Sequence, residues 1–136
     1  MARGAKVVVG ESARPFFGST FRASHTIEPD ELSTALHNAT FLSCRPRVSS
    51  RDPTRPGAVR VIAIASTHAA DMVVAYTPNQ RVLFVSDLFS PGLPPNPPVA
   101  REVRDAVQAH NLAIDAIAGG HGGVGTRADL DAAAGL

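Results

Sequence analysis

The stretch RVLFVSDLFSPG at positions 81–92 indicates the fold class of this chain. Its first half is a short apolar run with the composition of a buried strand, and Asp87 closes that run before a Pro-Gly turn. Two similar apolar runs occur elsewhere, VRVIAI at 59–64 and LAIDAIA at 112–118. Because the predicted strands alternate with helices in the last half of the chain, the pattern predicts an α/β fold.

A side chain of the metal-ligand type follows each of the three runs. His68 comes after the first run, Asp87 ends the second, and His121 lies in the glycine-rich loop that follows the third. Loops that leave successive strands can converge on one edge of a sheet, where α/β proteins usually place their sites. Imidazole and carboxylate are common ligands of zinc and similar ions. The sequence therefore predicts a metal site formed by these three side chains.

Each of these residues also has an interpretation without metal, which the sequence leaves open. His68 could be an exposed loop residue, Asp87 could cap a local turn, and His121 could be incidental in a flexible glycine hinge. A carboxylate in apolar surroundings costs free energy unless it is hydrogen-bonded, paired or metal-bound, which favours the ligand interpretation for Asp87. Asp71 could orient the imidazole of His68.

The three segments together resemble the later motifs of the metallo-β-lactamase fold hydrolases. That family has a His before a strand that ends in a proline turn, an Asp after an apolar strand, and a His in a Gly-Gly-His-Gly loop. His68, Asp87 and His121 match these positions in order. The resemblance extends from about residue 2 to residue 130. It implies an α/β fold that is part of the family's αββα sandwich, with a mixed sheet flanked by helices.

The family's HxHxDH motif is absent from this sequence. The five histidines are His25, His37, His68, His110 and His121. The opening stretch at 2–17 resembles the segment downstream of that motif in full-length members. We therefore expect residues 1–136 to form a single domain that corresponds to the C-terminal portion of a metallo-β-lactamase-like domain. In the family, His68 would serve one metal, His121 the other and Asp87 both, so three ligands are shared between two incomplete positions.

Two functions are consistent with this resemblance. The first is a metal-dependent hydrolase of small molecules with zinc as its cofactor, two ions in full-length members, which is truncated and weak or inactive alone. The alternative is a non-catalytic, degenerate module that acts through self-association or a partner. The strand AKVVVG at 5–10 would lack its earlier sheet neighbours, and the uncharged run of Val7, Val8 and Val9 would leave its edge open to pairing. A homo-oligomer is therefore expected.

The composition argues against other classes of partner. The chain has 136 residues, 44% of them hydrophobic, with 13 basic and 12 acidic residues and a net charge of +1. This balance gives no electrostatic basis for binding nucleic acid or membrane surfaces. Cys44 is the single cysteine, so an intrachain disulfide is excluded. Since no apolar stretch approaches the ~20 residues of a membrane span and no signal peptide is evident, a cytoplasmic location is expected.

The sequence pattern also predicts the order of the elements. Strands are expected at 5–10, 58–65, 72–76, 82–85 and 112–118, with the third and fourth as an antiparallel hairpin. Helices are expected at 29–38, 98–111 and 127–134. Thr126 and Asp129 are spaced as a capping box for the last helix. Proline-rich loops are expected at 45–57 and 90–98.

Overall fold

The computed structural model describes residues 7–24, 26–27, 41–44 and 57–136. The predicted helix at 29–38 and nearly all of the predicted loop at 45–57 lie outside the described residues. The elements follow the order β1 (Val7–Gly10), α1 (Arg14–Arg22), β2 (Phe41–Cys44), β3 (Arg60–Ile64), β4 (Met72–Thr77), β5 (Val82–Ser86), α3 (Pro97–Ala109), β6 (Ala116–Gly119), β7 (Val124–Gly125) and α4 (Arg127–Ala133). None of the described helices is long and apolar enough to span a membrane.

Five strands form a mixed sheet in the order β3-β4-β5-β6-β7. The β4–β5 hairpin is antiparallel, as predicted, and β3 is also antiparallel to β4. Strand β6 is parallel to β5, and β7 returns antiparallel to β6. Strands β3, β5 and β6 therefore run in the same direction, and the chain leaves all three at the same edge of the sheet.

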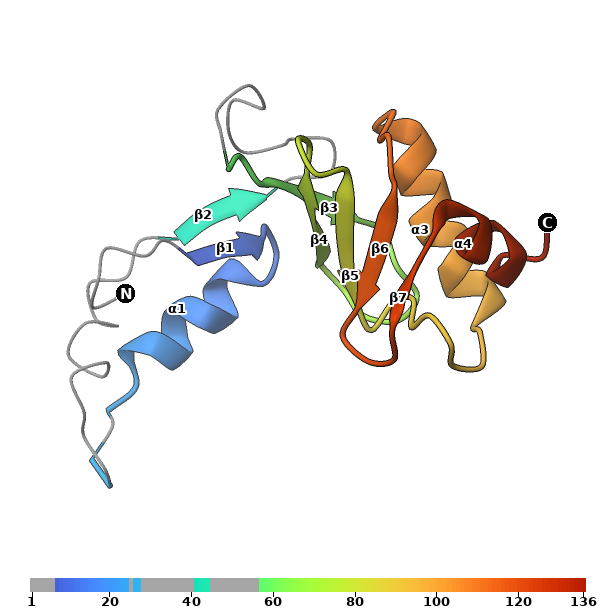
Figure 1. The fold of residues 1–136 in the computed structure, drawn as a ribbon. Coiled ribbons are helices and arrows are strands. Elements are labelled where there is room, and N and C mark those ends of the chain that lie inside the picture. Colours follow the sequence, from blue (N-terminus) through green and yellow to red (C-terminus); the bar gives the residue numbers. More distant parts are fainter. Residues whose placement is uncertain (1–6, 25, 28–40, 45–56) are drawn as a thin grey trace.

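Helices α3 and α4 cover one face of this sheet (Figure 1). The apolar stripe of α3 consists of Val99, Val103 and Val107, all buried at helical spacing. These side chains belong to one core with Leu130 of α4 and with the alternate residues of the strands that point to the same side. The sheet residues of this core are Ile62, Ile64, Val74, Tyr76, Leu83, Val85 and Ile117.

The β1–β2 pair and α1 lie on the other side of the five-stranded sheet (Figure 1). Strand β1 pairs with β2 in parallel, and the ring of Phe21 in α1 packs on Phe41 with 5.2 Å between centroids. Cys44 donates a hydrogen bond from Sγ to the carbonyl oxygen of Val61 at 3.5 Å, and burial raises the pKa of its thiol. The mixed sheet flanked by helices that the resemblance implied is present.

Strand β6 is shorter than the sequence pattern suggested. It begins at Ala116, whereas the strand was predicted to start at Leu112. Residues 112–115 form a connection: Leu112 N donates to Val107 O at 3.0 Å, and the side chain of Asp115 pairs with Arg81 at 2.9 Å. The apolar character of this connection arises because Leu112 is itself part of the core.

Candidate functional site

The sheet topology brings the three predicted ligand residues to the same edge. His68 follows β3, Asp87 follows β5 and His121 follows β6, and these three strands are parallel to one another. Strands β5 and β6 are direct neighbours, whereas β4 separates β3 from β5. Because neighbouring strands lie about 4.8 Å apart, β3 ends about 10 Å from β5. The edge is shared, but the spacing along it is unequal.

Asp87 and His121 are in contact. The Nε2 atom of His121 lies 3.2 Å from Oδ1 of Asp87, and both side chains reach solvent, with exposed fractions of 72% and 48%. This contact is an ion pair when the imidazole is protonated. Asp87 lies in a tight turn in which Leu88 N donates to Val85 O at 3.1 Å and Ser86 has a φ of 50°.

Two glycines allow the loops that carry this pair to approach each other closely. Gly120 N donates to Ser86 O at 2.8 Å, and a Cβ atom on Gly120 would lie 3.0 Å from Oδ1 of Asp87. A Cβ atom on Gly119 would lie 2.6 Å from the carbonyl oxygen of Phe89. Any larger residue at Gly119 would push the two loops apart. The glycines before His121 are therefore sites of close backbone contact.

The same two loops are joined again further along. Gly123 N donates to the carbonyl oxygen of Pro91 at 2.9 Å. Gly122 has a φ of +77°, and a Cβ atom there would lie 2.5 Å from the same Pro91 oxygen. Backbone hydrogen bonds thus hold the loops together on both sides of the Asp87–His121 contact.

His68 stands apart from this pair. It is an exposed residue of the loop at 65–71, and its backbone N–H donates to Oγ of Ser66 at 3.1 Å. The preceding Thr67 N donates to both carboxylate oxygens of Glu102, at 3.0 and 3.1 Å. Asp71, predicted as a partner of the His68 imidazole, accepts a hydrogen bond from the hydroxyl of Ser12.

Sequence reasoning missed the side chains that hold the His68 loop. Glu102 lies 35 positions from Thr67, and Ser12 lies 59 positions from Asp71, so no local pattern links them. Within the described ranges, no group of three or more His, Cys, Asp or Glu side chains is placed to hold a metal ion. The structure therefore brings two of the three predicted ligands together and leaves the third at a distance.

The Asp87–His121 pair has the donor atoms and the spacing of two ligands of one ion. Zinc binds imidazole nitrogen and carboxylate oxygen at about 2.0–2.2 Å in tetrahedral sites, so two such donors are roughly 3.3 Å apart. The observed separation of 3.2 Å matches this edge of a tetrahedron. In distance alone, the pair therefore matches two of the ligands of a zinc ion.

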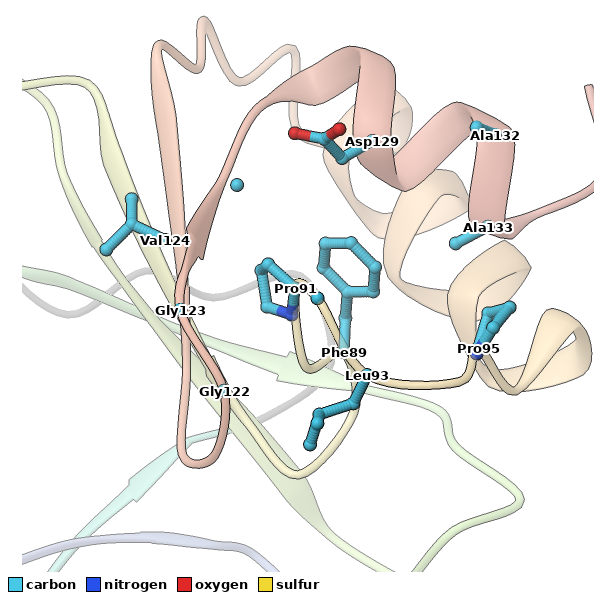
Figure 2. A pocket seen from close by; sticks show the side chains of 12 residues that line it. Phe89, Pro91, Leu93, Pro95, Gly122, Gly123, Val124, Asp129, Ala132 and Ala133 are labelled. Carbon is cyan, nitrogen blue, oxygen red and sulfur yellow. The ribbon is translucent and has the colours of Figure 1, made fainter.

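A groove of about 680 Å³ borders the same loops (Figure 2). Its walls are mostly apolar: Phe89, Pro91, Leu93 and Pro95 come from the loop after β5, Val124 from β7, and Ala132 and Ala133 from α4. Its size is in the range of small-molecule sites. The carboxylate of Asp129 lines it as well, and hydrogen bonds from the backbone and hydroxyl of Thr126 lower the pKa of that carboxyl.

No protein family and no curated protein sequence matches this chain. Solved structures do match its fold. The DIM-1 metallo-β-lactamase matches 98% of the chain with a TM-score of 0.60 at 18% identity, and the match covers 58% of that protein. The apo chemotaxis sensor ODP from T. denticola matches 97%, with a TM-score of 0.61 at 14% identity and the same 58% coverage.

A third matching structure extends the range of proteins that share this fold. The flavodiiron protein from Giardia intestinalis matches 98% of the chain with a TM-score of 0.59 at 14% identity, and the match covers 35% of that protein. The chain thus spans less than two thirds of each of these structures. At such low identities the likeness concerns the fold alone. A metallo-β-lactamase, a chemotaxis sensor and a flavodiiron protein all share this fold. The chain has the metallo-β-lactamase fold over the part of that fold which it spans.

Proposed function

We propose that this chain carries part of the metal site of a metal-dependent hydrolase, with zinc as the cofactor. Asp87 and His121 form its preformed pair, and His68 is the third ligand. The observation that supports this most is the 3.2 Å contact between Nε2 of His121 and Oδ1 of Asp87 at the ends of two parallel strands. Zinc, when bound, supplies Lewis-acid activation of water for attack on a carbonyl or phosphorus centre of a small molecule.

The number of ligands limits what residues 1–136 can do by themselves. A catalytic zinc usually has three protein ligands and an open position. Two suitable donors are in contact, and His68 follows a strand that lies one strand further away. We therefore expect weak, substoichiometric zinc binding and no turnover. Further ligands of the kind that an HxHxDH motif supplies would be needed for catalysis.

The first experiment measures zinc. The purified chain is dialysed against trace zinc and its metal content is measured by elemental analysis, with Asp87→Asn and His121→Ala as site variants. His110→Ala, which removes a histidine at the end of α3, is the matched control. We expect well under one ion per chain, reduced further by the site variants and unchanged by the control. One or two tightly held ions per chain would contradict weak binding and point to a site completed across a dimer.

The second experiment measures turnover of β-lactam, thioester and phosphodiester substrates. We expect none from residues 1–136. If the reading frame upstream of Met1 encodes an HxHxDH segment, joining that segment to the chain should restore zinc binding and hydrolysis. Turnover by the 136 residues alone that His121→Ala abolishes would contradict this expectation.

The exposed part of an uncharged row on the sheet face opposite α3 and α4 favours a second function, self-association as a non-catalytic module. The row crosses all five strands in direct register: Val61, Ala75, Phe84, Ala118 and Val124. Phe84 is 45% exposed and Val124 is 70% exposed. Large and small residues alternate along the row. Because β1 and β2 contact β4 and β3 on this face, the part of the row that a second copy would cover lies at Phe84 and Val124.

The occupant that we propose for this face is a second copy of the chain. Phe84→Lys should shift sedimentation at high concentration towards monomer, because a buried, unpaired charge in an apolar contact is strongly unfavourable. Val8→Lys in β1 tests the strand edge as the other contact. A native chain that stays monomeric at high concentration, with a melting temperature independent of concentration, would exclude self-association by either surface.

A further inference from the structure

The loop that carries His68 is tied to two different layers of the fold. At its start, Thr67 N donates to both carboxylate oxygens of Glu102 in α3. At its end, Asp71 accepts from the hydroxyl of Ser12, which follows β1. The loop therefore depends on side chains from elsewhere for its position.

Glu102 gathers several donors from this loop. Burial by itself raises the pKa of the Glu102 carboxyl, but hydrogen bonds from the hydroxyls of Thr67 and Ser66 and from the Thr67 backbone outweigh burial and lower the pKa. The side chain is therefore an anion at neutral pH. Ser66 in turn accepts the backbone N–H of His68 at 3.1 Å. Glu102 therefore binds the backbone of Thr67, the residue directly before His68.

The helix that carries Glu102 is also the support of the Asp87–His121 edge. Val103, next to Glu102 in sequence, is 1% exposed and lies in the same core as Val85 of β5 and Ile117 of β6. Those two strands lead directly into the loops of Asp87 and His121. Helix α3 is therefore linked to both parts of the candidate site: to the His68 loop through Glu102, and to the strands before Asp87 and His121 through the core.

We infer that Glu102 is a positioning residue that sets where His68 lies relative to Asp87 and His121. This inference rests on the proposed function, because it takes His68 to be a metal ligand. Groups that orient metal ligands through hydrogen bonds typically change metal affinity by 10–100-fold when they are removed. Because Glu102 acts through the loop backbone, we expect about a tenfold loss, at the lower end of that range, in the equilibrium by which His68 joins the bound zinc, and at most about a twofold loss in overall zinc affinity.

The experiment uses the 136-residue chain with Glu102→Ala and Glu102→Gln. Asp105→Ala, on the same helix with its carboxylate paired to Arg104, is the matched control. NMR follows hydrogen exchange at the Thr67 amide without metal and, in a zinc titration, the imidazole signals of His68 and His121. Glu102→Ala should speed Thr67 exchange about tenfold and weaken zinc binding at His68 about tenfold, with less than a threefold change at His121.

The outcomes separate this inference from the proposed function. Glu102→Gln keeps one carbonyl acceptor for Thr67 N and should recover part of the lost affinity, whereas Asp105→Ala should match the native chain. If zinc shifts the imidazole signals of His68 in the native chain and Glu102→Ala leaves their zinc dependence unchanged, the positioning role is wrong and the proposed function stands. If zinc never shifts His68 although Thr67 exchange responds to Glu102→Ala, His68 is no ligand and both proposals fail for this residue.

Discussion

The loops after β5 and β6 and the loop after β3 leave the same edge of the sheet, but they are held in different ways. The first two follow neighbouring strands and are joined by backbone hydrogen bonds from Gly120 to Ser86 and from Gly123 to Pro91. The loop after β3 is held by side chains of Glu102 and Ser12. Strand pairing thus builds the Asp87–His121 contact directly. The position of His68 depends on interactions that single substitutions can remove.

The largest effect is expected where the two paired loops touch. Gly119→Ala would place a Cβ atom 2.6 Å from Phe89 O and 2.8 Å from His121 O, both backbone atoms that cannot move without displacing a loop. We expect a loss of about 2–3 kcal/mol in the free energy of unfolding, measured by urea denaturation. The contact between Asp87 and His121 should loosen with it.

Gly123→Ala is the matched control in the same loop. Its Cβ atom would meet only Pro91 O, at 3.8 Å, which is an ordinary van der Waals distance. Its effect on stability should stay within about 0.5 kcal/mol. Equal losses of stability from the two variants would mean that the close approach of the two loops does not contribute to the free energy of unfolding.

The contribution of each ligand to zinc affinity should follow the way in which its loop is held. At a fixed free zinc concentration, His121→Ala should lower zinc affinity about tenfold, because it breaks a pair whose donors already lie 3.2 Å apart. His68→Ala should lower overall affinity only about twofold, since this residue follows a strand one position further from the pair. Competition with a chromophoric chelator measures both, and equal losses would show that His68 closes onto the pair when metal binds.

The parts of the fold that the sequence predicted are those with a strong local pattern. The apolar runs of β3, β4, β5 and β6 and the valine stripe of α3 bury one face each, and their periodicity is visible without the structure. The capping box of α4 was also predicted, and it is present with both of its hydrogen bonds. Placing His68, Asp87 and His121 at one edge followed from the strands they succeed.

The parts that the sequence did not predict depend on distant partners. Strand β7 has only two residues, and it exists because Gly125 and Val124 pair with β6. Helix α1 contains glycine and threonine, which are weak helix formers, and Phe21 packs on Phe41 of β2. The separation of His68 from the other two ligands arises because β4 lies between β3 and β5 in the sheet, as it does along the chain, and the sequence pattern did not predict that β3 pairs with β4.

The next-largest effect, after those on Gly119 and on the zinc ligands, is expected in α4, the helix that follows the His121 loop. In α4, Thr126 accepts from Asp129 N, and Asp129 accepts from Thr126 N at 2.7 Å. Thr126→Ala removes the hydroxyl from this capping box and should cost about 1 kcal/mol. Because the hydrogen bonds hold the pKa of Asp129 below its ordinary value, their contribution is present above that value and is lost as pH falls through the folded-state pKa.

The pH profile distinguishes this cap from a simple loss of packing. Urea midpoints measured from neutral pH down to the acid limit should fall less steeply for Thr126→Ala than for the native chain. Asp131→Ala, which removes the partner of Arg127 in the same helix, should leave the contribution of the capping box to that slope in place. Parallel profiles for Thr126→Ala and the native chain would show that Asp129 gains no stability from the cap.

The smallest effect lies at the far end of the His68 loop. Ser12→Ala removes the hydroxyl that donates to Asp71, at an exposed position where a lost hydrogen bond is largely replaced by water. We expect a change of at most about 0.5 kcal/mol in global stability. The backbone contact between Gly10 and Asp71 is untouched by this variant. The two residues are so close that a Cβ atom on Gly10 would lie 2.3 Å from Cβ of Asp71. The local effect should exceed the global one: amide exchange at 68–71 should rise several-fold while the urea midpoint barely moves. A global loss of about 2 kcal/mol or more would mean that the loop after β3 is as integral to the fold as the two loops after β5 and β6, and the contrast between them would disappear.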